Sequence, residues 1–381
     1  MRERYRVTAA LGIVQILTWG SSFYLLAVLG APIMAETGWP RPAVMGGVSV
    51  ALLASAFTAP RVGRIIAARG GRYVLSRGVV TLALGLAALG MAPNVSIYLA
   101  IWALIGCAMA ASLYEAAFST LGRLYGVSAR GAITALTLWA GFASTICWPL
   151  SALLAETFGW RLTCLIYAAL HLAITLPLVR FGLPADRKAE EIKTKGVAPI
   201  AWSDPRLITL AVAGVCMAFV FATISVHLIP LLLAQGYALA VAVGLGAVIG
   251  PAQVGARLLE MLGRERHAPV VTLIVASGCV ATGLAGLAAS LWAAICLVIY
   301  GCGTGLWSIA RGTVPLASFG ADGYPAVMGK IAVPVIGASA VAPILGAIVT
   351  DSVGPEATLT LLLGVAGVAF IAALAHWRIT R

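Results

Sequence analysis

The sequence predicts an all-α membrane protein with twelve transmembrane helices in two six-helix halves. Three features indicate this fold class: a high apolar content, twelve long apolar stretches, and an uneven distribution of Lys and Arg. Of the 381 residues, 61% are hydrophobic and only 10% are charged, whereas soluble domains carry about 25% charged residues. The chain is therefore not an ordinary soluble enzyme.

Each apolar stretch is long enough to form one helix across the bilayer, which takes about 20 mostly apolar residues. In chain order, we expect spans at 8–30, 43–66, 73–92, 96–119, 131–154, 160–180, 206–233, 237–260, 268–289, 291–313, 326–349 and 357–377.

The positive charge lies in alternate gaps between these stretches. Of the 25 Lys and Arg residues, all but Arg41 and Arg161 fall in the gaps on one side or in the ends of the spans that border those gaps. Cytoplasmic loops carry the excess of Lys and Arg, so we expect both termini and the central loop in the cytoplasm. The net charge of +12 therefore reflects the orientation of the chain in the lipid bilayer, and we expect no nucleic-acid partner. We expect this bilayer to be the plasma (inner) membrane.

The longest polar stretch divides the spans six and six. It contains prolines, a glycine and mixed charges, as linkers do. We therefore predict an N-terminal bundle at 1–180, a cytoplasmic linker at 181–205 and a C-terminal bundle at 206–381.

The two halves share traces of an internal repeat. Pro149 is followed by Glu156 near the end of span five, and Pro343 is followed by Asp351 near the end of span eleven. Two six-span halves with weak internal symmetry are typical of secondary transporters.

Two loop segments resemble motifs of the major facilitator superfamily. Gly63-Arg64-Ile65-Ile66-Ala67-Ala68-Arg69-Gly70-Gly71-Arg72 is similar to its Gly-x-x-x-Asp-Arg-x-Gly-Arg-Arg loop, and Gly159-Trp160-Arg161 resembles the Gly-Trp-Arg before span six. Residues 255–264 look like a shortened second copy of the loop. The resemblance implies the major facilitator fold, with spans one, four, seven and ten lining a central cavity. Ala67 replaces the motif's acidic residue, which puts the family's usual cytoplasmic latch in doubt.

A further resemblance points to the monocarboxylate and oxalate/formate branch. Gly38-Trp39-Pro40-Arg41 is similar to a Gly-Trp-Ser-Arg pattern after span one of that branch. Arg257 in span eight matches the arginine that binds a substrate carboxylate there. Gln253 stands where the branch has an acidic residue.

Glu115 lies inside span four among small residues that let a neighbouring helix approach. Charged groups inside a membrane are costly and mark proton or substrate pathways, so Glu115 is a candidate for proton coupling. A structural ion pair with Arg123 or Arg311 is the alternative. The resemblance places Glu115 and Arg311 on opposite sides of the cavity, where the Arg311 guanidinium would bind an anion; otherwise Arg311 extends to the lipid headgroups.

Other polar and aromatic residues in the spans are candidate cavity residues. Span one carries a polar stripe, and the adjoining candidates come from spans four, seven and ten. The set comprises Gln15, Thr18, Trp19, Ser21, Ser22 and Tyr24 in span one, with Tyr114, His227 and Trp307. A single buried His is more often structural than coupling, and this applies to His227 and to His171.

No motif indicates an enzyme, a cofactor or a metal site: a GxxxxGK[ST] loop, HExxH and CxxC are all missing from the sequence. We expect a monomeric secondary transporter that works by alternating access, carrying a small organic anion with protons. Export of drugs, metabolites or toxic metalloid compounds is the alternative function. A non-transporting sensor would normally carry an added soluble domain.

Overall fold

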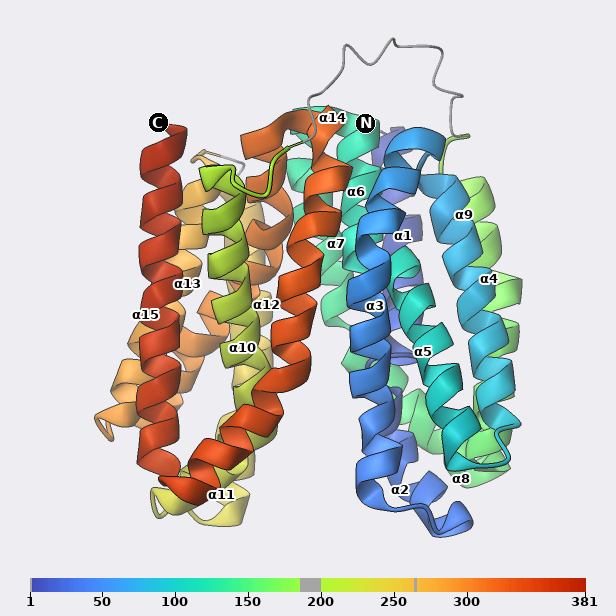
Figure 1. The fold of residues 1–381 in the computed structure, drawn as a ribbon, viewed down its shortest axis with the longest axis horizontal. Helices are drawn as coiled ribbons and strands as arrows, with labels where there is room; N and C mark the ends of the chain where they lie inside the picture. Colours follow the sequence, from blue (N-terminus) through green and yellow to red (C-terminus); the bar gives the residue numbers. More distant parts are fainter. Residues whose placement is uncertain (1, 186–199, 264–265) are drawn as a thin grey trace. The chain divides into compact units, whose positions relative to one another are not determined.

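The computed structural model describes residues 2–185, 200–263 and 266–381, and within these ranges every regular element is a helix (Figure 1). The elements in chain order are α1 (Arg2–Gly20), α2 (Leu25–Thr37), α3 (Arg41–Arg69), α4 (Gly71–Gly90), α5 (Val95–Ser112), α6 (Tyr114–Tyr125), η1 (Gly126–Ala129), α7 (Arg130–Gly141), α8 (Ala143–Leu170), η2 (His171–Thr175), α9 (Leu176–Gly182), α10 (Pro205–Ala234), α11 (Leu239–Ala247), α12 (Ile249–Leu262), α13 (Pro269–Ala288), α14 (Ala293–Ser352) and α15 (Pro355–Thr380). Most of the predicted linker, 186–199, and Arg264 of the second loop copy lie outside the described residues.

All twelve predicted spans coincide with helical segments. Among the described residues, nine stretches are long and apolar enough to cross a membrane, and two of them, Arg130–Gly182 and Ala293–Ser352, each hold two predicted spans. Gly159 and Gly320 separate those spans at φ values of 77° and 70°, which glycine adopts readily because it lacks a Cβ. The remaining span, eight, consists of α11 and α12.

The chain forms two compact units. Unit 1 comprises Met1–Ala198 with Ala321–Val333, and unit 2 comprises Pro199–Gly320 with Pro334–Arg381. The predicted bundles and linker follow from the apolar spans and the polar stretch, whereas the two units follow from contacts within the structure. The bounds of the bundles and linker therefore stay a prediction.

Close helix packing builds the core of unit 1. α3, α4 and α5 lie side by side (Figure 1). A Cβ on Gly106 of α5 would overlap the Ala51 carbonyl of α3, so the glycine lets the two backbones touch. Such small residues drive helix association in lipid, where the hydrophobic effect between helices is weak. The buried rings of Trp102, Tyr98 and Trp160 fill the space around these contacts.

Unit 2 packs by the same principle. α15 lies against both α10 and α13 (Figure 1). Gly283 of α13 faces the backbone of Tyr300 in α14, where a Cβ would come within 2.8 Å of the Tyr300 nitrogen. The resulting core contains Leu284, Leu297 and Leu362, all with no exposed surface.

The loop between α3 and α4 departs from the family motif at Ala67. The Arg123 side chain of α6 donates to the carbonyls of Ile66, at 3.1 Å, and of Ala67. Ala67 belongs to the last turn of α3, whose carbonyls lack a partner within the helix, whereas the Ile66 carbonyl also accepts from the Gly70 amide at 2.9 Å. Arg123 therefore caps α3 through its backbone at the position where the family motif carries a carboxylate.

Candidate functional site

The first membrane span is broken near its middle. α1 ends at Gly20 and α2 starts at Leu25. Across the break, the Tyr24 amide bonds the Trp19 carbonyl at 3.1 Å and the Leu25 amide bonds the Ser22 carbonyl at 3.2 Å. The backbone hydrogen bonds thus change from the four-residue spacing of an α-helix to a five-residue and then a three-residue spacing. Discontinuous helices of this kind form the substrate sites of many transporters.

Hydroxyl side chains accompany this break. Thr18, Ser21 and Ser22 have no exposed surface, and each donates to a carbonyl four residues earlier, Val14, Leu17 and Thr18 respectively. Such bonds compete with the backbone ladder and bend helices. The predicted polar stripe of span one therefore turns its hydroxyl groups toward its own backbone.

A second break lies in span four, between α5 and α6 at Leu113, whose ψ of −163° is extended. The buried Gln15 side chain donates to the Ser112 carbonyl at 2.8 Å and accepts from the Trp19 indole at 3.1 Å. Gln15 thereby satisfies a carbonyl at the broken end of α5. It also ties the two discontinuous spans together and fixes the plane of the Trp19 ring.

Six aromatic rings surround these two breaks, and we call them the aromatic cluster: Trp19, Phe23, Tyr24, Tyr114, Phe118 and Trp148. Trp19 lies 5.2 Å from Tyr114, centroid to centroid, and Tyr114 stacks on Phe118 at 4.9 Å. Tyr24 connects to Trp148 at 6.1 Å with the planes at 89°. These offset and edge-to-face geometries are the favoured ones for aromatic pairs.

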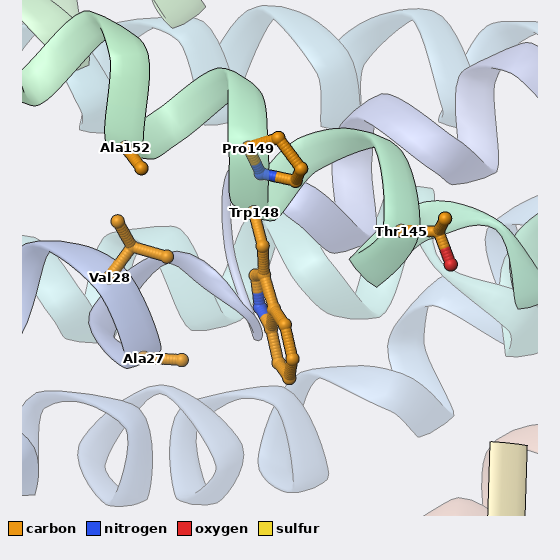
Figure 2. Close-up of a pocket in the computed structure, with 6 residues that line it drawn as sticks. All are labelled: Ala27, Val28, Thr145, Trp148, Pro149 and Ala152. Carbon is orange, nitrogen blue, oxygen red and sulfur yellow. The ribbon is translucent and has the colours of Figure 1, made fainter. Parts of the chain in front are cut away.

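Trp148, at one end of the aromatic cluster, borders a pocket between α2 and α8. The pocket is lined by Ala27, Val28, Thr145, Trp148, Pro149 and Ala152. Figure 2 shows the Trp148 side chain extending from its helix beside Ala27 and Val28. Trp148 is 45% exposed, so its ring is accessible from the pocket while it also contacts Tyr24.

Glu115 occupies the first turn of α6, next to Tyr114 of the aromatic cluster. Glu115 is partly exposed, whereas its small flanking residues predict a buried, close-packed setting. The positive end of a helix dipole stabilises a negative charge in the first turn. The break at Leu113 thus creates the helix start that favours a carboxylate at this depth of the span.

In unit 2, the predicted Arg257 lies in α12 and is 7% exposed. Its Nε approaches the Gly305 carbonyl of α14 at 3.4 Å. One turn earlier, Gln253 donates to the Thr304 hydroxyl at 3.1 Å. A Cβ on Gly305 would overlap the Gln253 backbone, so the glycine lets α12 and α14 approach at this level.

The other predicted site residues of unit 2 lie on α14 and α10. Arg311 is partly buried in α14, and Trp307, one turn earlier, packs against the apolar core of the unit. His227 of α10 pairs with the Pro343 carbonyl at 2.9 Å. This bond gives His227 the structural role that is most common for a single His in an apolar helix.

Sequence inspection did not single out Phe23, Phe118 and Trp148 as site residues. Their only sequence signals are Phe23 next to Tyr24, and the Trp148-Pro149 pair in an apolar stretch. The structure brings Gln15, Trp19, Tyr24 and Tyr114 together in unit 1, and their role as cavity residues stays a prediction.

Comparison with known proteins identifies the family. Residues 11–333 match the model of the Major Facilitator Superfamily, so the chain belongs to that superfamily. No curated protein matches the chain in sequence.

Solved structures of transporters share the fold along nearly the whole chain. The human organic anion transporter MFSD10 (TETRAN) is 14% identical with a TM-score of 0.78, covering 97% of this chain and 99% of that chain. The transporter FucP in the outward conformation is 14% identical with a TM-score of 0.77, at 97% and 98% coverage. The proton:xylose symporter XylE, bound to 6-bromo-6-deoxy-D-glucose, is 12% identical with a TM-score of 0.72, at 100% and 96% coverage.

The fold and the family define the class of protein. The chain is a multi-pass integral membrane protein of the major facilitator fold, and it is a secondary transporter of small molecules and not an enzyme.

Proposed function

We propose that this transporter carries a small organic anion together with protons. The observation that carries the proposal is the buried Arg257 guanidinium inside membrane span eight. An arginine at membrane depth is costly and marks a substrate or ion pathway. Its fixed fork of donors matches a carboxylate bidentately. Arg311, also on a membrane helix, is the second candidate donor for the anion.

Glu115 is the proposed coupling residue. Its place at the start of α6, beside Tyr114, connects a carboxylate to the aromatic cluster. Alternating access would change the environment of such a carboxylate, loading a proton in one state and releasing it in the other. The carboxylate would then return in its charged form, which the start of α6 stabilises.

The test is uptake into proteoliposomes of labelled formate, oxalate, lactate and benzoate, with and without an inward proton gradient. Arg257→Lys should lose most of the uptake of the transported anion, because a point charge replaces a bidentate fork. Arg161→Lys is the matched control, since Arg161 is a partly exposed arginine that pairs with Glu36 at 2.7 Å. Unchanged affinity in Arg257→Ala would contradict the anion site.

A second candidate function, export of drugs, metabolites or toxic metalloid compounds, is supported by the aromatic cluster. Trp148 and Tyr24 offer ring faces that attract organic cations and apolar molecules. Efflux of ethidium and arsenite from loaded proteoliposomes distinguishes the two functions. Efflux that persists in Arg257→Ala but fails in Trp148→Ala would favour export over anion carriage.

We also propose the orientation and organisation that the charge pattern predicts. The protein would lie in the inner membrane as a monomer, with both termini in the cytoplasm. Its bundles at 1–180 and 206–381 would be joined by the 181–205 linker. Supporting this, all but two of the 25 Lys and Arg lie on one predicted side. A reporter active only in the cytoplasm, fused after Arg381, should be active; a silent fusion expressed at normal level would contradict the twelve-span orientation.

A further inference from the structure

The break in span one is held by one buried histidine on another helix. The Nε2 of His171 lies 2.7 Å from the Ser21 hydroxyl, and its Nδ1 lies 3.1 Å from the Thr175 hydroxyl. His171 is 1% exposed, and Ser21 has no exposed surface. Ser21 is the first residue after α1 ends, so the bond joins the break itself to the segment η2.

The segment that carries His171 has an unusual backbone for a local reason. Residues 171–175 form a π-helical turn, and the Leu176 amide bonds the His171 carbonyl five residues earlier. Pro177 follows in the first turn of α9 and has no amide hydrogen to donate. A π-turn of this kind widens the helix and often lies at functional sites. Here it places the imidazole against the break of span one.

The hydrogen bonds give both ring nitrogens of His171 a partner. The Ser21 hydroxyl lies 2.8 Å from the Leu17 carbonyl, which can only accept. When Ser21 donates its proton there, its oxygen accepts from the Nε2–H of His171. The Nδ1 atom pairs with the Thr175 hydroxyl, so Ser21, the imidazole and Thr175 are all hydrogen-bonded, as buried polar groups require.

The break also packs against span five, which precedes the span that carries His171. A Cβ on Gly20 would overlap the Cys147 Sγ of α8, and this thiol approaches the Ile16 carbonyl at 3.5 Å. α8 and η2 therefore hold α1 at Gly20 and Ser21. Trp19, Phe23 and Tyr24, on the same turn, belong to the aromatic cluster.

The geometry points to His171 as a positioning residue: its hydrogen bond to Ser21 fixes the break in span one and, through it, the Trp19 and Tyr24 rings of the substrate site. This inference rests on the proposed function only in taking the aromatic cluster as part of the substrate site. His171 acts here through its hydrogen bond to Ser21, and the proposed proton coupling stays with Glu115.

The experiment measures the local geometry without any substrate. All seven cysteines are free, so the full-length protein in nanodiscs can be labelled with N-ethylmaleimide and each site quantified by mass spectrometry. Cys147 reports on the break, because it is fully buried against Gly20. Cys164, fully buried in span six beyond the Gly159 kink, is the internal control for general loss of packing.

Ser21→Ala and His171→Leu should label Cys147 about three- to tenfold faster than the parent, as expected when one membrane hydrogen bond no longer opposes local opening. Labelling of Cys164 should stay unchanged. His171→Gln, whose amide can replace the Nε2 donor, should remain within about twofold of the parent. The double variant Ser21→Ala/His171→Leu should label Cys147 no faster than His171→Leu does, because both substitutions remove the same Ser21–His171 bond.

The inference is overturned if Cys147 labels at the parent rate in Ser21→Ala, if Cys164 accelerates in parallel, or if His171→Gln behaves as His171→Leu does. Because no substrate is used, these outcomes are independent of the carboxylate uptake assay. Failure of that assay alone would remove the anion proposal and leave the role of His171 standing.

Discussion

Replacing Gln15 by Met should destabilise unit 1 through the loss of two specific hydrogen bonds. The Gln15 side chain is fully buried, donates to the Ser112 carbonyl at 2.8 Å and accepts from the Trp19 indole at 3.1 Å. Met keeps a similar length and volume, so the change removes the bonds and creates little cavity. The Ser112 carbonyl stays buried at a helix break, and the Trp19 indole stays partly buried.

The expected magnitude follows from what such bonds contribute in a membrane. Side-chain hydrogen bonds between transmembrane helices average about 0.6 kcal/mol and reach about 1.7 kcal/mol. The bond to Ser112 joins two helices, whereas the bond to Trp19 lies within α1. Two bonds give about 1–3 kcal/mol of lost free energy of unfolding, at the upper end if the indole and the carbonyl find no new partner.

The assay is reversible unfolding of the purified protein in bicelles by titration with SDS. Thr18→Val is the matched control, because the equally buried Thr18 hydroxyl bonds only carbonyls of its own helix, at 2.8 Å to Val14 and 3.4 Å to Gln15. We expect its loss to cost less than about 0.6 kcal/mol. A second variant, Trp19→Phe, removes the indole donor together with part of the ring, and its effect should be non-additive with that of Gln15→Met.

Equal free energies of unfolding for Gln15→Met and Thr18→Val would refute the reasoning. So would full additivity of Gln15→Met with Trp19→Phe, because the pair would then share no bond. A loss in Gln15→Met that exceeds its coupling to Trp19, which lies on the same helix, would establish that the bond to the Ser112 carbonyl ties the two broken spans together.

Three further outcomes are expected from the structure. Glu115→Gln should abolish accumulation driven by a pH gradient and leave substrate exchange partly intact, as counterflow uptake in proteoliposomes will reveal; accumulation equal to the parent would leave Glu115 a structural residue. Gly106→Ala should cost about 1–3 kcal/mol in SDS unfolding, because its Cβ would overlap a carbonyl of α3, whereas Gly364→Ala, which faces open space, should not destabilise. Asp204 caps α10, and its hydrogen bonds to Arg206 lower the pKa of its carboxyl. The contribution of the charged carboxyl to stability is therefore complete above the ordinary carboxyl pKa of about 4. It is lost as pH falls through the lowered pKa of the folded protein. Thermal unfolding from pH 6 to pH 3 should show a smaller drop in Asp204→Asn than in the parent, and equal drops would contradict this assignment.

The sequence predicts the membrane class and the number of spans because the bilayer imposes a simple rule on it. A helix must cover the hydrocarbon core with about 20 apolar residues, and every backbone amide must bond within its own helix. Length and hydropathy therefore indicate the approximate place of the spans, although Gly159 and Gly320 alone separate two pairs of them. Polar residues in span one, such as Gln15 and Trp19, also stand out because lipid-facing helices exclude them.

The breaks within the spans were decided only by the tertiary structure. The break at Leu113 has no helix-breaking residue of its own, and it is stabilised by Gln15, 97 residues earlier in the chain, bonding the exposed Ser112 carbonyl. The role of His171 depends in the same way on Ser21, 150 residues away. Hydropathy averages over neighbours in sequence and cannot register a bond between distant residues, whereas the geometry of the aromatic cluster depends on these bonds.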